Sequence, residues 1–382
     1  MILSLNFNKG KATLFLARSL AFNIHLLILS LNSNPSFDPR LNCNISTGGK
    51  NLRALAQLLS VLLIVLTLGT AHANELVIYS GRSKSLVAPI IKQFETETGI
   101  KVKVRYGSTA QLAVALLEEQ SKSPADLFWA QDAGALGAIN KHGLFNTLPE
   151  SILLKVPQHF RNSGGGWVAT SGRARVIAYA SERVKPEALP DSIFALTDPK
   201  WKGRVGWAPQ NASFQAFVTG LRKLKGEQQT EEWLRGMKAN GAKSYPKNTP
   251  IIQALAAGEI DLGLPNHYYL FRFKKSDSKF PVEQAFFKGG DPGNLVNVAG
   301  IGLLKTSSNT QAARSFVEFL LSAKAQQFFV SEVFEYPVTD EVIPNVKLLP
   351  LDELLKLMPK LDLEALDDLK GTLKLLRKVE IL

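Results

Sequence analysis

The fold is decided by residues 75–130, which read ELVIYSGRSKSLVAPIIKQFETETGIKVKVRYGSTAQLAVALLEEQSKSPADLFWA. Within this stretch, the segments 75–80, 100–106 and 125–130 have the length and the apolar or alternating composition of strands. The residues between them place apolar side chains at helical spacing. Strands that alternate with helices predict parallel-type sheets covered by helices, so we assign the chain to the α/β class.

The same rhythm resumes further along the chain, with long extended segments at 167–179 and 295–304. No Gly-, Ser- or Pro-rich linker separates two halves, so the chain must cross between lobes inside ordered segments, and these two are the natural crossings. Two lobes joined in this way enclose a hinged cleft that closes around a ligand. The predicted lobes are 75–172 plus 299–345 for the first and 173–298 plus 346–382 for the second.

Composition indicates an ordinary globular protein. Apolar residues make up 45% and charged residues 20% of the 382 residues, which excludes wholesale disorder. The single cysteine, Cys43, excludes Cys-based zinc sites, Fe–S clusters and an intrachain disulfide. The net charge is +12, but residues 1–73 hold six Lys or Arg and one acid. The remainder is modestly basic and has no block of five like charges, so we expect no nucleic-acid binding.

A secretory leader precedes the predicted fold. Residues 58–68, LLSVLLIVLTL, follow Lys50 and Arg53 and are followed by an Ala-x-Ala end at 71–73. This pattern is typical of a cleavable signal peptide, and the apolar run is short for a membrane span. We therefore predict a leader over 1–73, cleavage after Ala73 and a periplasmic location; an uncleaved membrane anchor is the alternative. Residues 1–49 are long for a leader and indicate a start codon assigned too far upstream, or else a membrane-proximal segment.

The segment Asn266-His267-Tyr268-Tyr269 follows a strand expected at 259–264 and holds the one adjacent tyrosine pair among seven tyrosines. Phenolate is a hard oxygen ligand whose proton leaves only in favour of a strongly polarising cation such as ferric iron. On a strand the two rings would point to opposite faces, whereas a strand-to-helix loop can aim both at one point. Packing of two half-buried rings on different sides is the alternative interpretation.

Two further strand-to-helix turns are suited to an anion. Residues 79–83, YSGRS, combine helix-start N–H groups with the fork of Arg82. Residues 209–213, PQNAS, place Asn211 as a helix N-cap. A capped turn with an exposed Arg82, and an Asn211 side chain used only for capping, are the alternatives, and the residues themselves do not separate the interpretations.

Enzyme motifs are missing from the sequence. There is no G-x-S-x-G elbow, no H-E-x-x-H and no phosphate-binding P-loop. Beyond the leader the histidines are His142, His159 and His267, which lack the spacing of metal ligands. We therefore expect no enzyme activity, and a hydrolase with a dispersed site stays as the less favoured alternative.

In this order, the motifs resemble those of the bacterial periplasmic ferric-ion-binding proteins, the solute-binding components of iron ABC importers. The resemblance covers nearly all of residues 75–382, and NHYY is its most specific motif. The segments that carry it are ELVIYSGRSKSLV, FETETGIKV, SPADLFWAQDAGAL, SGRARVIAY, DPKWKGRVGW, YPKNTPIIQALAAGEIDLG, NHYYLFRF, GGDPGNLV and VFEYPV.

This resemblance implies a two-lobed periplasmic-binding-protein fold of type II and ferric iron bound by Tyr268 and Tyr269. It also implies a synergistic anion, carbonate or phosphate, that completes the iron's ligands. The anion-binding residues that it suggests are Arg82, Ser83, Asn211, Ala212, Ser213, Asn248 and Asn266.

Three positions depart from the family pattern. Ser83 stands where many members have a histidine, Gln131 stands where they have a glutamate, and Phe214 stands where others have a tyrosine. The first lobe therefore offers no matched protein ligand. We expect iron to sit mainly on the tyrosine pair, with Gln131 and the neighbouring Asp132 beyond its direct ligands.

The resulting hypothesis is a monomer that captures ferric iron in the periplasm and delivers it to an inner-membrane ABC permease. The same fold binding a small oxyanion such as sulfate or phosphonate without metal is the nearest alternative. A role in shielding the cell from iron, rather than in transport, also stays open.

Overall fold

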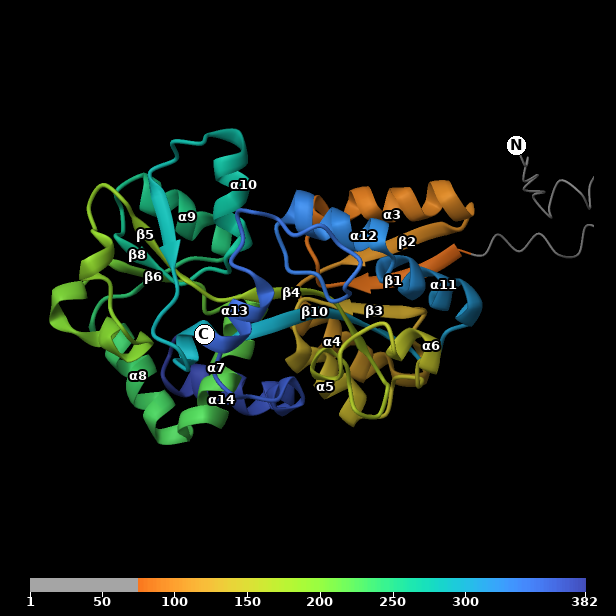
Figure 1. The fold of residues 1–382 in the computed structure, drawn as a ribbon. Helices are drawn as coiled ribbons and strands as arrows, with labels where there is room; N and C mark the ends of the chain where they lie inside the picture. The colour runs from red at the N-terminus through yellow and green to blue at the C-terminus, as the bar shows by residue number, and fades with distance from the viewer. Residues whose placement is uncertain (1–74) are drawn as a thin grey trace, which may run out of the picture. The chain divides into compact units, whose positions relative to one another are not determined.

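The computed structural model describes residues 75–382. The predicted leader over 1–73, its cleavage site and Cys43 lie outside the described residues. The described part contains two five-stranded sheets, each with helices on both faces (Figure 1). This arrangement confirms the α/β, two-lobed fold class. Within residues 75–382, no helix is both long and apolar enough to cross a membrane.

The first sheet has the strand order β2-β1-β3-β10-β4. Its strands are β1 (Glu75–Ser80), β2 (Lys101–Tyr106), β3 (Leu127–Ala130), β4 (Val168–Ala174) and β10 (Val296–Leu303). Strand β1 pairs in parallel with β2 and β3, as the alternation of strands and helices predicts. Strand β10 pairs antiparallel with β3 and β4, so the sheet is mixed.

Two groups of helices cover this sheet (Figure 1). One face carries α3 (Lys84–Thr98), α11 (Thr310–Leu320) and α12 (Ala323–Phe328), and the other carries α4 (Thr109–Glu119) and α5 (Ala133–Lys141), with the short α6 (Glu150–Leu153) nearby. The Phe94 ring of α3 meets the Phe316 ring of α11 edge-on at 4.9 Å, and Trp129 of β3 packs on Phe316 at 5.8 Å. These aromatic contacts fill the core between the sheet and the helices α3 and α11.

The second sheet has the order β7-β6-β8-β5-β9 and is mixed as well. Its strands are β5 (Ile177–Ala180), β6 (Val205–Trp207), β7 (Lys243–Ser244), β8 (Leu262–Gly263) and β9 (Val282–Ala285). Strand β6 runs parallel to β7 and β8, whereas β5 runs antiparallel to β8 and β9.

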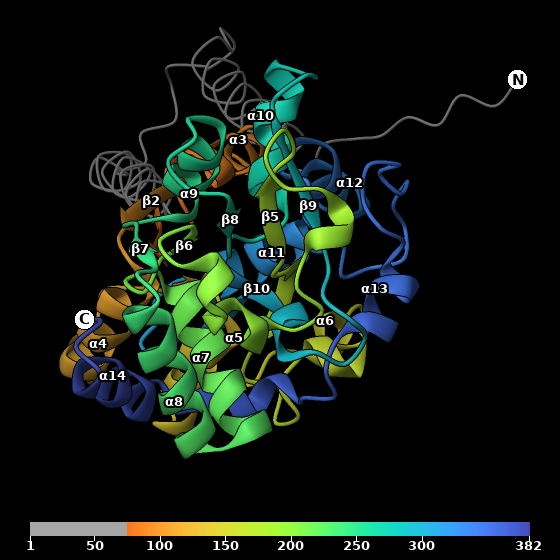
Figure 2. The ribbon, with the colours of Figure 1, turned by 90° about the vertical axis from the view of Figure 1, so that its left-hand side faces the viewer.

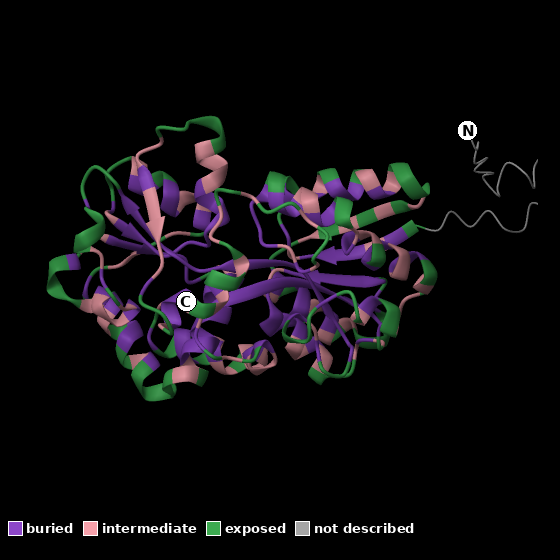
Figure 3. Cartoon of the chain, viewed as in Figure 1, coloured by how far each residue is buried: buried purple, intermediate pink, exposed green. Residues whose placement is uncertain are grey.

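Helices again cover both faces of the second sheet (Figure 2). They are α7 (Ala212–Lys225) and α8 (Glu227–Ala239) on one face, and α9 (Asn248–Ala256) and α10 (Tyr268–Ser276) on the other. Trp207 packs edge-on against Phe214 and Trp233, which joins β6 to both α7 and α8. Figure 3 shows the central strands of both sheets as buried, whereas β2, β7 and β9, at the sheet edges, are partly exposed.

The chain crosses from the first sheet to the second between Ala174, the last residue of β4, and Ile177, the first of β5. This crossing lies inside the extended segment 167–179 that the sequence marks out. The return crossing lies between β9 and β10, just before the second predicted segment. The exact lobe boundaries stay a prediction.

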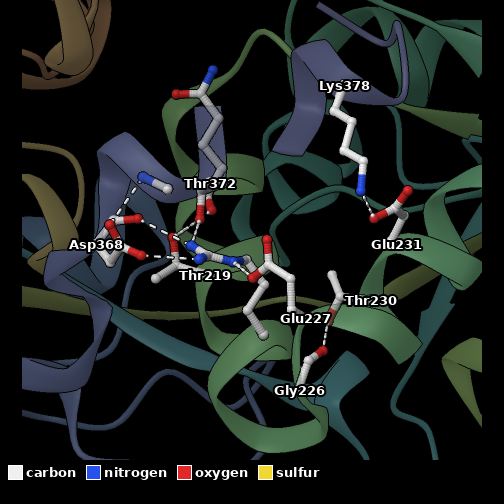
Figure 4. A network of polar contacts seen from close by, with 11 residues as sticks. Thr219, Gly226, Glu227, Thr230, Glu231, Asp368, Thr372 and Lys378 are labelled. Carbon is white, nitrogen blue, oxygen red and sulfur yellow. Dashed lines mark hydrogen bonds and ion pairs between the residues drawn. The ribbon is translucent and has the colours of Figure 1, made fainter. Parts of the chain in front are cut away.

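The C-terminal segment contacts the loop before β4 on the side of the first sheet and the helices α7 and α8 on the side of the second. It contains α13 (Leu351–Leu357), a short turn of helix at Leu363–Asp367 and α14 (Leu369–Lys378). Glu364 accepts hydrogen bonds from the Asn162 side chain and the Ser163 hydroxyl, at 2.9 and 3.1 Å. Asp368, Thr372 and Thr219 gather where α14 meets α7 (Figure 4). The Lys378 ammonium of α14 also pairs with Glu231 of α8 at 2.7 Å.

Candidate functional site

The adjacent tyrosines occupy the first two positions of α10. Their rings stack, with centroids 4.3 Å apart and planes inclined by 29°. Both side chains are buried, and Tyr269 retains 8% exposure. The two rings therefore lie against each other, which excludes packing on different sides, although both tyrosines belong to the first turn of α10 and not to the loop before it. Their role as iron ligands stays a prediction.

Both phenols lie in a site with unusual hydrogen bonding and charge. Among residues 75–382, the Tyr268 hydroxyl has no hydrogen-bond partner although it is fully buried. Burial, followed by the neighbouring Tyr268 phenol, raises the pKa of Tyr269 well above its ordinary value, while the charges of Arg82 and Arg173 act to lower it. A buried hydroxyl without a partner is costly, so this atom is suited to binding a ligand.

His267 holds the start of α10 in place. The Ala174 N–H donates to its Nδ1 at 3.1 Å, so Nε2 carries the proton and donates to the Phe334 carbonyl at 2.8 Å. Burial lowers the pKa of His267 to about 4, which keeps the ring neutral. Both ring nitrogens are thus occupied by backbone groups, and His267 positions the tyrosines instead of binding a metal.

Arg82 is buried and paired. Its Nη2 donates to both carboxylate oxygens of Glu335 at 2.7 Å, and the Ser171 hydroxyl donates to the same carboxylate. The alternative of an exposed Arg82 is therefore wrong. Glu335 follows Phe334, a non-glycine residue at φ 62°, in the left-handed region that side chains rarely adopt. The Arg82 Nε stays unpartnered among the described residues.

A cleft of about 640 Å³ opens in front of Tyr269. One wall comes from the turns after β1, β2 and β3, and the other from the turns before α7 and α9 and from α10 itself. Four cationic side chains line it, and no carboxylate does among the described residues. The cationic residues are Arg82, Lys84, Lys247 and Arg272. A cleft of this charge favours anionic ligands.

The anion loop predicted on the second lobe forms one end of this cleft. Asn211 and Ala212 line it, whereas Ser213 is buried behind them. The Asn211 side chain caps α7 by accepting from the Ser213 N–H at 3.0 Å and the Ser213 hydroxyl at 2.6 Å. Arg175 donates to the carbonyls of Ser213 and Leu264 at 2.8 and 2.6 Å, which ties this loop to the end of β8.

The other predicted residues are divided between the cleft and the layer behind it. Ser83 and Gln131 line the cleft, and Ser83 begins α3 without a side-chain capping hydrogen bond. Asn248 and Asn266 are buried, and their Nδ2 atoms have no partner within residues 75–382. Asp132 is buried too and caps α5 by accepting from the Ala135 N–H at 2.9 Å, and burial raises its pKa to about 6.

Sequence reasoning missed Arg173. This residue lies at the end of β4 and is 1% exposed, and no nitrogen of its guanidinium has a hydrogen-bond partner among the described residues. Its charge acts on Tyr268, Arg82, Glu335 and Asp132. The only signal in the sequence is its occurrence in SGRAR, a segment quoted for the resemblance without a role for either arginine.

The donors expected of a common metal centre are absent from the described residues, where no three His, Cys, Asp or Glu side chains gather. The candidate site consists of two buried phenols, arginines and unpartnered amides in the cleft and in the layer behind it. The metal and anion roles of the individual residues stay predictions.

Comparisons with known proteins agree with this description. Residues 122–353 match the family described as bacterial extracellular solute-binding protein. The major ferric iron-binding protein of Neisseria meningitidis serogroup B is 35% identical over 302 residues, which cover 77% of this chain and 90% of that protein. The Fe(3+)-binding periplasmic protein of Serratia marcescens is 33% identical over 324 residues, with coverage of 84% and 95%.

A similar solved structure is iron-bound HitA from Pseudomonas aeruginosa, with a TM-score of 0.77 and 34% identity over 80% of this chain and 99% of that one. A Trichodesmium protein in complex with iron and citrate has a TM-score of 0.66 and 29% identity over 80% and 99%. The fold, the cleft and these similarities together show that the chain belongs to the bacterial extracellular solute-binding proteins, in the family of the periplasmic ferric-ion-binding proteins.

Proposed function

We propose that this protein captures ferric iron together with a small oxyanion in the periplasm and delivers it to an inner-membrane ABC permease. The observation that carries the proposal is the stacked pair Tyr268 and Tyr269, buried at the start of α10 beside a cationic cleft. Phenolates suit a hard trivalent cation, and the relatives named above are iron-binding proteins.

In this proposal the anion balances charge in the cleft and completes the coordination of the metal. Arg82 is already neutralised by Glu335, but Lys84, Lys247 and Arg272 line the cleft without a carboxylate partner among the described residues. These three charges repel a free ferric ion, so iron enters with, or after, an anion. Carbonate or phosphate meets Arg82 on one wall and the Asn211–Ser213 loop on the other. Asn248 and Asn266 offer N–H donors that are unpartnered among the described residues.

Transport then depends on closure of the lobes. The two walls of the cleft belong to different sheets, so movement at the Ala174–Ile177 crossing brings them together around the cargo. The permease distinguishes the closed form from the open form. The protein acts as a monomer, is secreted with a cleavable leader and performs no chemistry on its cargo.

The test is iron loading of the purified mature protein with and without bicarbonate or phosphate, followed by metal analysis. We expect about one ferric ion per chain, retained through gel filtration only when an anion is present. A protein that emerges free of iron under both conditions would contradict the proposal.

The second candidate function is binding of a sulfate- or phosphonate-type oxyanion without metal, and the cationic lining of the cleft favours it. Calorimetric titration of the metal-free protein separates the two functions. High affinity for an oxyanion, together with no uptake of iron, would support this second candidate.

A further inference from the structure

Arg173 stands out because it is a buried charge without a partner. An unpaired guanidinium inside a protein strongly destabilises the folded state unless water or an anion satisfies it. All three of its nitrogens lack hydrogen-bond partners within residues 75–382. By comparison, the other two arginines of this cluster are engaged: Arg82 with Glu335, and Arg175 with two backbone carbonyls.

The strand geometry places Arg173 beside the Arg82–Glu335 pair. Side chains two residues apart on a strand point to the same face, and Ser171, two positions before Arg173 on β4, already donates to Glu335. The charge of Arg173 also acts on both Tyr268 and Tyr269. Arg173 therefore shares one buried polar layer with the phenols and with Arg82.

Counting charges in this layer leaves an excess of positive charge. Three buried guanidiniums, those of Arg82, Arg173 and Arg175, face two buried carboxylates, those of Glu335 and Asp132. The carboxylates do not neutralise the layer, and the Asp132 Oδ2 atom itself has no partner among the described residues. One bound anion would balance the excess and supply hydrogen-bond acceptors.

We infer that Arg173 is a second guanidinium of the oxyanion site, which works with Arg82 to hold the anion next to Tyr268. Two planar guanidinium forks suit the several acceptor oxygens of carbonate or phosphate better than one does. The inference rests on the proposed function for the identity of the cargo, but the anion site needs no iron in order to be occupied.

The experiment measures anion binding in the absence of iron. The unfolding midpoint of the metal-free protein is recorded against rising bicarbonate, phosphate or sulfate, because a ligand of the folded state raises the midpoint as its concentration exceeds the dissociation constant. We expect a rise with at least one of these anions. In Arg173→Gln the half-saturating concentration should increase by about tenfold or more. The midpoint without anion should not fall below that of the wild type, because the substitution removes an unpartnered buried charge and breaks no hydrogen bond.

Two further variants keep the test decisive. Arg173→Lys keeps the positive charge but replaces the planar guanidinium with a single ammonium group. The variant should raise the half-saturating anion concentration while its circular dichroism spectrum stays that of the wild type. It therefore decides the question if Arg173→Gln does not fold. Arg235→Gln removes an exposed arginine, paired with Glu231, and should behave as the wild type.

An anion response that is identical in Arg173→Lys and the wild type, or a wild type that responds to none of the anions, would overturn the inference. Iron uptake is scored separately, so an anion response lost with Arg173 in a protein that takes no iron would support this inference and contradict the proposed function.

Discussion

The Arg82 guanidinium and the Glu335 carboxylate form an ion pair at 2.7 Å between residues 253 positions apart in the chain, and both side chains are almost fully buried. The pair joins the turn after β1 to the segment that follows α12. Removing one partner of a buried pair leaves an uncompensated charge, which costs far more than loss of an exposed pair.

Glu335→Gln should therefore lower the free energy of unfolding of the metal-free protein by about 3–5 kcal/mol. The matched control is Glu332→Gln, three residues earlier, which breaks an exposed pair with Lys275 and should cost less than about 1 kcal/mol. Urea denaturation measures both. Equal losses in the two variants would show that the buried pair has no special weight.

His267 should act through position and not through coordination. His267→Ala leaves the Ala174 N–H and the Phe334 carbonyl buried without their partner, at a cost of about 1–3 kcal/mol for each group. We expect a lower unfolding midpoint and weaker iron binding, with the visible band of the iron-loaded protein at its original wavelength. A shifted band would mean that His267 is a ligand after all.

Asp261, just before β8, should make the stability of the folded protein depend on pH in the acid range. Burial by itself would raise its pKa, but hydrogen bonds from Arg183 and Arg204, both at 2.6 Å, lower it overall. A carboxyl whose pKa is lower in the folded state stabilises the protein above its unfolded pKa of about 4, and that contribution is lost as pH falls through the folded pKa.

Asp261→Asn should therefore destabilise the protein by about 1–2 kcal/mol at pH 7, a figure reduced because both arginines reach solvent. The difference from the wild type should shrink below about pH 4. Thermal unfolding from pH 3 to pH 8 checks this, with the exposed Asp352→Asn as control. A difference that does not vary with pH would refute the linkage.

The C-terminal helix should depend on its N-cap. Asp368 accepts from the Gly371 N–H at 2.9 Å and pairs with Arg222 of α7 at 2.9 Å. Asp368→Ala should cost about 1–2 kcal/mol, and Asp368→Asn, which keeps a capping oxygen, should recover most of it. If thermal unfolding finds Asn as harmful as Ala, the ion pair with Arg222 matters more than the cap.

Much of the fold was predictable because most strands correspond to a short run of apolar or alternating residues in the sequence. The first three strands and most helices follow that rule, as in α3, whose buried residues between Leu86 and Phe94 fall at helical spacing. The antiparallel strands were harder, because pairing direction depends on contacts between distant segments. Strand β9, whose residues are only partly buried, has no such apolar run and was not predicted.

The site was predictable only where one residue type carried the signal. Two neighbouring tyrosines are rare enough to identify from sequence, but their stacking depends on α10 beginning at Tyr268. Arg173 gave no signal beyond its place in SGRAR, since an arginine on a strand normally reaches solvent. Its burial follows from the pairing of β4 with β10 and from the Glu335 segment, which comes 162 residues later in the numbering.

The measurement that tests the central claim most directly is the visible absorption spectrum of the iron-loaded protein and of Tyr268→Phe and Tyr269→Phe. Phenolate-to-iron charge transfer should colour the wild type orange-red, and each substitution should weaken or shift the band and reduce iron affinity by more than about 100-fold, since even partners behind the direct ligands cost 10–100-fold. A wild type that holds ferric iron without colour, or a band that survives both substitutions unchanged, would contradict the assignment of the tyrosine pair as the iron ligands.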